Sequence, residues 1–143
     1  MKKNNNKGFT LAELLIVVAI IAVLVAIAIP IFTSQLEKAR EAVDLANMRD
    51  AYAVVTADTL APDANIANHD VANVTYTAAT LDTNGNITKP ASAVVTLTQT
   101  VDKWQTAAPS VAGQALTVAN AGKGHTYTIT VNAETGVIVL TYA

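Results

Sequence analysis

An uninterrupted apolar run from Leu14 to Phe32 is the feature that most limits how this chain can fold. The run holds 19 consecutive residues without a charge, Ser, Thr, Asn or Gln. As a helix rising about 1.5 Å per residue it is about 28 Å long, close to the roughly 30 Å hydrocarbon core of a bilayer. A core helix of a 14.9 kDa soluble protein would show a polar face, which this run lacks. The run therefore predicts a membrane-inserted helix.

The charges on either side of the run predict its orientation. Three lysines precede it: Lys2, Lys3 and Lys7. Charges of both signs follow it: Glu37, Lys38, Arg40, Glu41 and Asp44. Because positive residues favour the cytoplasmic side, we expect a single-pass topology with the short N-terminus in the cytoplasm and the bulk of the chain outside.

The remaining composition excludes several classes of function. The 143 residues allow one domain of ordinary size, and the absence of cysteine excludes disulfides, thiolate metal sites and a cysteine nucleophile. A net charge of −2 gives no support for direct nucleic-acid binding, so a nucleic acid would be only an indirect partner. Neither His69 nor His125 lies in a cluster with ligand spacing. We expect no catalytic residue, no metal site and no cofactor, and hence not an enzyme.

The start of the apolar run allows three interpretations. A secretory signal peptide would use Ala26-Ile27-Ala28 as its cleavage site. A plain single-span anchor would remain uncut. Neither explains Gly8-Phe9-Thr10 or the charge of Glu13 at the edge of the run. Locally, Thr10 and Glu13 also fit a capping box, in which threonine caps the first helical turn and glutamate reaches back to the cap.

The segment Lys7-Gly8-Phe9-Thr10-Leu11-Ala12-Glu13-Leu14, followed by the apolar run with Pro30, resembles the class III leader of type IV prepilins and pseudopilins. The resemblance covers roughly residues 3–50, and alanine at position 12 is a mild departure from the usual Val or Ile. It implies cleavage between Gly8 and Phe9 by a membrane aspartyl prepilin peptidase, and N-methylation of Phe9. Unlike a secretory signal, this leader leaves the apolar helix attached to the product.

The resemblance also implies how the subunit assembles. Phe9, Thr10 and Glu13 would take part in assembly, with the Glu13 carboxylate pairing with the N-terminal amine of a neighbouring subunit. Pro30 would kink the helix gently or let the segment before it unwind in the filament. The implied partners are copies of the chain in a homopolymer, the prepilin peptidase/methyltransferase, a pilus assembly platform protein and, before assembly, the lipid bilayer.

The implied function is that of a structural subunit of a type IV pilus, stored in the cell membrane and then displayed as an extracellular filament. Two alternatives stay open: a pseudopilin of a type II secretion or DNA-uptake system, and a single-span membrane-anchored binding protein. Without cysteines the chain cannot close the C-terminal disulfide loop common in pilins of two-membrane bacteria. The resemblance therefore leans towards pilins of Gram-positive, clostridia-like bacteria.

Residues 33–60 lack Gly and Pro and predict a continuation of the helix, giving about 50 helical residues in all. One apolar stripe, expected to seat a sheet, contains Leu45, Met48, Tyr52 and Val55. A second stripe contains Leu36, Ala39, Val43 and Ala46. The opposite charges at helical spacing, Glu37–Arg40, Lys38–Glu41 and Arg40–Asp44, predict a solvated face. Contacts between neighbouring stems are the alternative.

Short alternating segments predict a β-rich head after Ala61-Pro62. We expect strands at residues 73–81, 94–101, 125–132 and 137–142, and loops at 63–73 and 105–114. The turn at 82–86 resembles a calcium loop only superficially, because its glycine is misplaced, and a hairpin is favoured. The predicted fold is α+β: a long N-terminal helix with a three- to five-stranded antiparallel sheet on its C-terminal half, as in pilins. The expected divisions are a leader (1–8), a membrane and assembly helix (9–32), an amphipathic stem (33–60) and a head (61–143).

Overall fold

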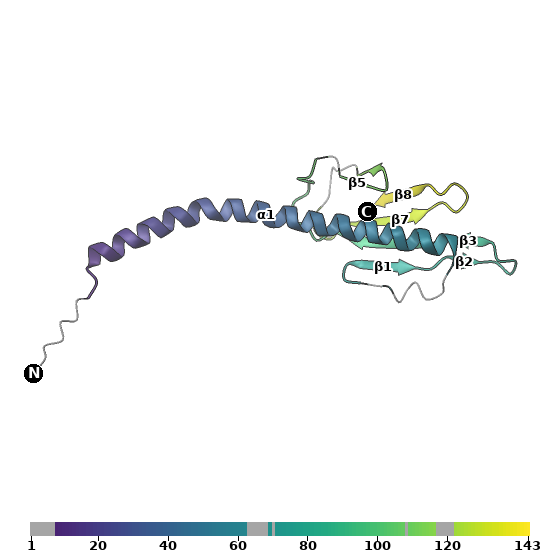
Figure 1. Ribbon diagram of the computed structural model, residues 1–143, viewed down its shortest axis with the longest axis horizontal. Helices are drawn as coiled ribbons and strands as arrows, with labels where there is room; N and C mark the ends of the chain where they lie inside the picture. The colour runs from purple at the N-terminus through teal and green to yellow at the C-terminus, as the bar shows by residue number, and fades with distance from the viewer. Residues whose placement is uncertain (1–7, 63–68, 70, 108, 117–121) are drawn as a thin grey trace, which may run out of the picture. The chain divides into compact units, whose positions relative to one another are not determined.

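The computed structural model describes residues 8–62, 69, 71–107, 109–116 and 122–143. The chain divides into two compact units, Met1–Leu36 and Glu37–Ala143. A single helix, α1 (Leu11–Leu60), contributes its first part to one unit and the rest to the other (Figure 1). Its 50 residues confirm the predicted length, and it ends immediately before Ala61-Pro62, where proline disfavours helix in the preceding residue.

In the first unit, α1 is helical through Pro30. The Thr33 hydroxyl donates to the Pro30 carbonyl at 3.0 Å. Every residue from 11 to 33 is exposed. The helix contains a window long and apolar enough to cross a membrane, and none of that window is buried. This surface therefore needs a lipid or protein environment.

The second unit holds a four-stranded antiparallel sheet in the order β1-β4-β7-β8. Its strands are β1 (Val74–Thr77), β4 (Ser92–Thr96), β7 (Thr126–Val131) and β8 (Ile138–Tyr142). Two small hairpins accompany it: β2 (Thr80–Leu81) with β3 (Ile87–Lys89), and β5 (Ser110–Val111) with β6 (Gln114–Ala115). The α+β prediction is confirmed, with one long helix and an antiparallel sheet packed against it.

The hydrophobic core lies between the sheet and one face of α1. On β7 the side chains of Tyr127, Ile129 and Val131 are buried, and the threonines between them are only partly covered. This confirms the predicted alternation. From α1 the core receives Leu45, Met48, Ala51 and Val55, while Tyr52 packs against it partly buried. The stripe predicted to seat the sheet therefore does so.

The strand boundaries differ from the prediction at two places, for one physical reason. The predicted strand at 73–81 is interrupted after Thr77, and the Ala79 N–H donates to the Asp58 carboxylate at 2.8 Å. The predicted strand at 94–101 ends at Thr96. The Leu97 N–H still donates to the His125 carbonyl, but the backbone amides from Thr98 to Val101 donate to carboxylates of α1. In both places a helix side chain replaces a neighbouring strand as the acceptor.

The predicted turns fare better. The 82–86 turn joins β2 and β3, and the 132–137 turn joins β7 and β8. The segment 105–114, expected to be a loop, includes the short β5–β6 hairpin, whose turn places Gly113 at φ 80°. Most of the predicted 63–73 loop, namely residues 63–68 and 70, lies outside the described part of the chain.

Candidate functional site

The amino-terminal end of α1 forms the capping box that its sequence allows. The Thr10 N–H and hydroxyl both donate to Oε2 of Glu13, at 2.8 and 2.6 Å. The Glu13 N–H donates in return to the Thr10 hydroxyl at 3.2 Å. These bonds satisfy donors that the first helical turn leaves without a partner. Within one chain, Glu13 therefore caps its own helix.

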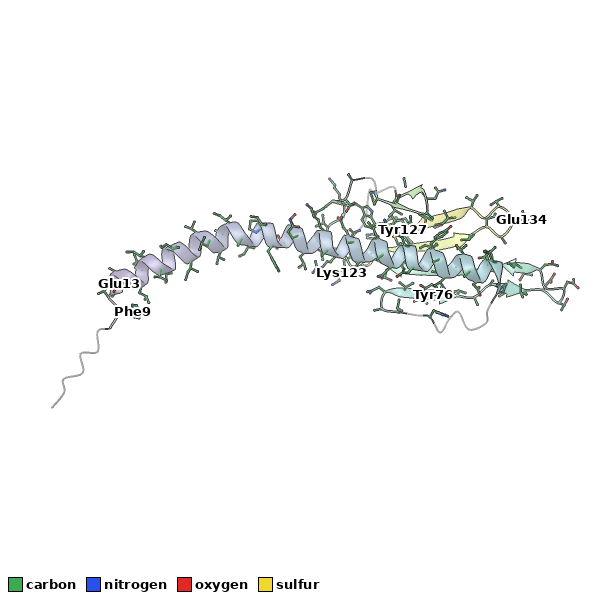
Figure 2. The ribbon with its side chains drawn as sticks, in the orientation of Figure 1. Phe9, Glu13, Tyr76, Lys123, Tyr127 and Glu134 are labelled. Atoms are coloured by element: carbon green, nitrogen blue, oxygen red, sulfur yellow. The ribbon has the colours of Figure 1, made fainter. Side chains whose placement is uncertain are left out.

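The residues around the predicted cleavage point are open to solvent. Phe9 is 93% exposed, and it lies with Glu13 at the start of α1 (Figure 2). A Cβ placed on Gly8 would meet no atom within 4 Å, and Gly8 has no positive φ. The fold of this chain therefore does not require glycine at position 8.

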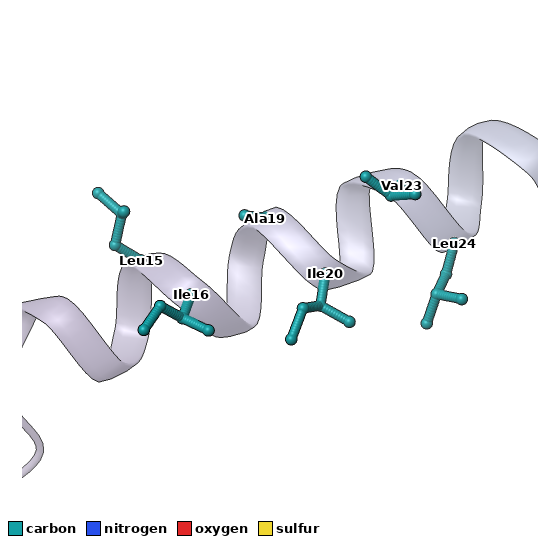
Figure 3. Close-up of a pocket in the computed structure, with 6 residues that line it drawn as sticks. All are labelled: Leu15, Ile16, Ala19, Ile20, Val23 and Leu24. Carbon is teal, nitrogen blue, oxygen red and sulfur yellow. The ribbon is translucent and has the colours of Figure 1, made fainter.

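The following helix offers only apolar surface. Figure 3 shows the side chains lining one shallow groove along it: Leu15, Ile16, Ala19, Ile20, Val23 and Leu24. Nothing in the described residues covers this groove, and its lining carries no polar side chain. Such a surface suits acyl chains or another apolar helix, but it holds no chemistry for binding a polar ligand.

Further along α1, three carboxylates are buried against the segment of residues 98–106, which we call the clamp segment. Glu37, Glu41 and Asp44 are 3%, 0% and 0% exposed. Each carboxylate accepts both the backbone N–H and the hydroxyl of a single threonine of the clamp segment, and one further backbone N–H. The three arrangements repeat one design, and each satisfies a buried charge with neutral donors.

The individual contacts are short. Asp44 accepts from Thr98 N–H at 2.9 Å, Thr98 Oγ1 at 2.8 Å and Gln99 N–H at 3.2 Å. Glu37 accepts from Thr100 Oγ1 at 2.8 Å, Val101 N–H at 2.8 Å and the Thr100 N–H. Glu41 accepts from Thr106 N–H at 3.0 Å, Thr106 Oγ1 at 2.8 Å and the Gln105 N–H.

Glu37 also has a cationic partner. Arg40 Nη1 lies 3.1 Å from the Glu37 carboxylate and donates to the Thr100 hydroxyl at 3.3 Å. Burial is the largest influence on the Glu37 pKa and raises it. The hydrogen bonds from Val101, Thr100 and Arg40 together outweigh burial and hold the pKa below its ordinary value of 4.5. The ionised form is thus the one that the surrounding groups stabilise.

The prediction of a solvated charged face was wrong for these three acids. The spacing of the acids points to burial, because they continue the apolar stripe of α1 at the same helical spacing. Seven of the nine buried positions of α1 follow one 4-3 spacing, and the other two, Leu45 and Thr59, lie directly beside it. The seven are Glu37, Glu41, Asp44, Met48, Ala51, Val55 and Asp58. Carboxylates at both ends of a buried stripe need hydrogen-bond donors. The clamp segment supplies them to Glu37, Glu41 and Asp44, and the Ala79 N–H donates to Asp58 at the other end. The second predicted stripe, by contrast, is exposed at all four positions.

The other candidate groups in the head are accounted for by local structure. Both carboxylate oxygens of Asp82 accept hydrogen bonds, from the N–H groups of Asn84 and Asn86 and from the Asn86 amide, at 2.8 to 3.0 Å. These bonds describe a hairpin turn. No three His, Cys, Asp or Glu side chains in the described ranges are grouped so that they could hold a metal ion.

Comparison with known proteins identifies the amino-terminal segment. Residues 3–29 match the family model described as the prokaryotic N-terminal methylation motif. The chain is 43% identical over 76 residues to the type IV major fimbrial protein FimA of Dichelobacter nodosus, which covers 50% of this chain and 48% of that protein. It is 53% identical over 53 residues to the type IV narrow pilus major component PilA5 of Thermus thermophilus, covering 35% of this chain and 46% of the relative.

The chain thus spans about half the length of the curated relatives that it matches. No solved structure is significantly similar to it. The motif and the two pilin relatives confirm the resemblance to the type IV pilin family, and both relatives are named as filament components, not enzymes. The lean towards clostridia-like bacteria stays a prediction.

Proposed function

We propose that this chain is the structural subunit of a type IV pilus, made as a membrane-anchored precursor, cleaved after Gly8, N-methylated at Phe9 and polymerised through α1. The observation that carries the proposal is the position of the methylation motif. The motif covers residues 3–29, and its described part lies at the start of α1, where every residue from 11 to 33 is exposed. The same helix would lie in lipid before assembly and against other copies afterwards.

The geometry at Gly8 supports a peptidase as the reason for this residue. Glycine is commonly required by a positive φ or by a close neighbour, and neither applies here. A protease working at the membrane face has its own need for a small residue before the scissile bond. We therefore assign the glycine to recognition by the prepilin peptidase.

Glu13 can serve the capping box and an intermolecular pair together. Both hydrogen bonds that Thr10 donates to the carboxylate reach Oε2, and Oε1 has no hydrogen-bond partner in the described part of the chain. A carboxylate has enough acceptor sites for both roles. In the proposed assembly step, Oε1 accepts a hydrogen bond from the N-terminal amine of a neighbouring copy. This ion pair attracts the two copies and fixes their register.

Intact-mass measurement of the protein from cells tests this proposal. Loss of residues 1–8 together with the gain of one methyl group is expected. A mass that starts at Ile29 would identify a secretory signal, and the full-length mass would identify an uncleaved single-span protein. Gly8→Val is the matched variant: a side chain there has open space, so the chain should fold normally and remain uncut.

Imaging of wild-type cells separates the pilus from its nearest alternative. A type IV pilus appears as long surface fibres, whereas a pseudopilus of a secretion or DNA-uptake system stays short. Processed protein on cells without long fibres would favour the pseudopilin.

A further inference from the structure

The two edges of the four-stranded sheet differ in whether their backbone groups are used. At the β1 edge, Val71 folds back on Val74: the Val71 N–H donates to the Val74 carbonyl at 3.2 Å, and the Val74 N–H donates to the Val71 carbonyl at 3.0 Å. This bridge occupies outward-facing groups of β1. The β1 edge is therefore blunted against another strand.

The β8 edge has no such cover. Thr126 and Ala143 exchange two hydrogen bonds at 2.9 and 3.0 Å, and the Asn132 N–H donates to the Val137 carbonyl at 2.9 Å. Because antiparallel bonding alternates, residues 137, 139, 141 and 143 face β7, and Ile138, Leu140 and Tyr142 direct their N–H and C=O groups outward. Across the described ranges, no backbone bond reaches those outward groups.

The sequence of the β8 edge also lacks the usual protection. Residues 137–142 read VIVLTY, without charge, proline or glycine. Val137 and Val139 are 50% and 47% exposed. Natural proteins protect open edges with lysine, proline or bulges, so an uncharged β-branched edge of this length is a site for strand addition.

We propose that β8 is an interaction edge at which the heads of two copies of this chain pair, antiparallel and centred on Leu140. A second copy fits for two reasons. The strand itself carries no charge, so the paired β8 side chains do not repel one another. The β1 edge of a second copy is blunted, which leaves its β8 as the matching open edge in the sheet.

The outward groups dictate the register of this pair. With Leu140 opposite Leu140 and Ile138 opposite Tyr142, three pairs each exchange two backbone hydrogen bonds. The pair also covers Leu140 and Tyr142, which now pack at the margin of the core only partly buried. The result is one continuous sheet across two heads.

This inference rests on the proposed function for its biological place. A two-fold contact closes after two copies, whereas a growing fibre needs a contact that repeats head to tail. Subunits stacked into one fibre all point the same way, so the β8 pair would join copies in neighbouring fibres. It would hold fibres side by side in bundles.

Single-cysteine variants of the full chain test the register, because the chain has no cysteine of its own. In the proposed pair the two Leu140 Cα atoms lie about 5.5 Å apart, within disulfide range. The two Val139 Cα atoms lie about 7–8 Å apart on a diagonal, outside it. Oxidised Leu140→Cys in detergent micelles should run mostly as a dimer, and Val139→Cys should give at least about fivefold less.

Random collision predicts the opposite order, because Val139 is more exposed than Leu140. Equal or stronger cross-linking of Val139→Cys, or no dimer with either variant, would overturn the proposal. Val139→Lys, which changes an exposed side chain, should abolish the dimer and leave fibres dispersed but as abundant as in the wild type. Bundles that persist with Val139→Lys would also overturn it. Dimers in micelles without fibres on cells would leave the edge standing and reject the pilus assignment alone.

Discussion

Thr106 donates both its backbone N–H and its hydroxyl to the buried carboxylate of Glu41, which lies 65 positions earlier in the chain. Thr98 with Asp44 and Thr100 with Glu37 repeat the relationship. These three threonine–carboxylate contacts hold the clamp segment against α1, although the segment pairs with no strand of the four-stranded sheet. The head is therefore held to the helix by buried carboxylates at both ends of the apolar stripe, with the clamp segment at one end and the Ala79 N–H on Asp58 at the other.

Glu41→Ala should destabilise the second unit strongly. The Glu41 side chain is fully buried, and its loss leaves the N–H groups of Gln105 and Thr106 and one hydroxyl without their acceptor. A hydrogen bond to a charged group contributes about 1.5–3 kcal/mol, and three such bonds are lost together. Denaturant unfolding of the full chain in micelles, followed by the fluorescence of Trp104, measures the change.

Asp50→Ala is the control for that experiment, since it removes the same charge from an exposed position of the same helix. Its free energy of unfolding should stay within about 0.5 kcal/mol of the wild type. Equal losses of unfolding free energy in the two variants would show that the net charge of the helix, and not the hydrogen bonds of Glu41 to the clamp segment, decides stability.

The stability of the head should fall in acid partly through Glu37. Its folded pKa is held below the ordinary 4.5. A group with a lowered folded pKa contributes stability that is complete above the unfolded pKa and is lost as the pH falls through the folded one. Glu37→Gln should therefore lower stability at pH 7 and flatten its decline below pH 4.5. An unchanged acid slope would contradict the role of Glu37.

Gln99→Met should stabilise the head. Gln99 is 0% exposed, and neither polar atom of its side-chain amide has a hydrogen-bond partner among the described residues. Methionine has a similar shape without the polar atoms, and it keeps the backbone N–H that donates to Asp44. Removing an unsatisfied buried amide should raise the free energy of unfolding by about 1–3 kcal/mol. A loss of stability would show that the amide is satisfied after all.

Local patterns were sufficient to predict the elements that depend on neighbouring residues. The helix from Leu11 to Leu60 follows from the apolar run, which continues as helix through Pro30, from the absence of Gly and Pro in residues 33–60 and from the proline at 62. The β7–β8 hairpin follows from strict alternation. The capping box was also visible, because Thr10 and Glu13 have the spacing that it needs. In each of these, the residues that interact are close in the sequence.

The hydrogen bonds between the three carboxylates and the clamp segment could not be predicted in the same way, because each joins residues more than fifty positions apart. The i,i+3 and i,i+4 charges suggested bonds within the helix, and only the Arg40–Glu37 pair is present among the described residues. The end of β4 at Thr96 has the same origin. The backbone of the clamp segment bonds to the helix instead of a strand, and alternation in the sequence does not report that choice.

The two roles of Glu13 can be separated by two variants that each remove one of them. Glu13→Gln keeps the capping box, since glutamine serves at this position, but removes the charge. Thr10→Val keeps the charge and the side-chain shape but removes the hydroxyl, which both donates to Glu13 and accepts from its N–H. If the carboxylate pairs with the N-terminal amine of a neighbour, Glu13→Gln should reduce surface fibres about tenfold or more, while Thr10→Val retains most of them. Both precursors should still lose residues 1–8, as intact mass will show. A normal number of fibres with Glu13→Gln would assign Glu13 to capping alone, because that variant keeps the capping box and lacks only the charge.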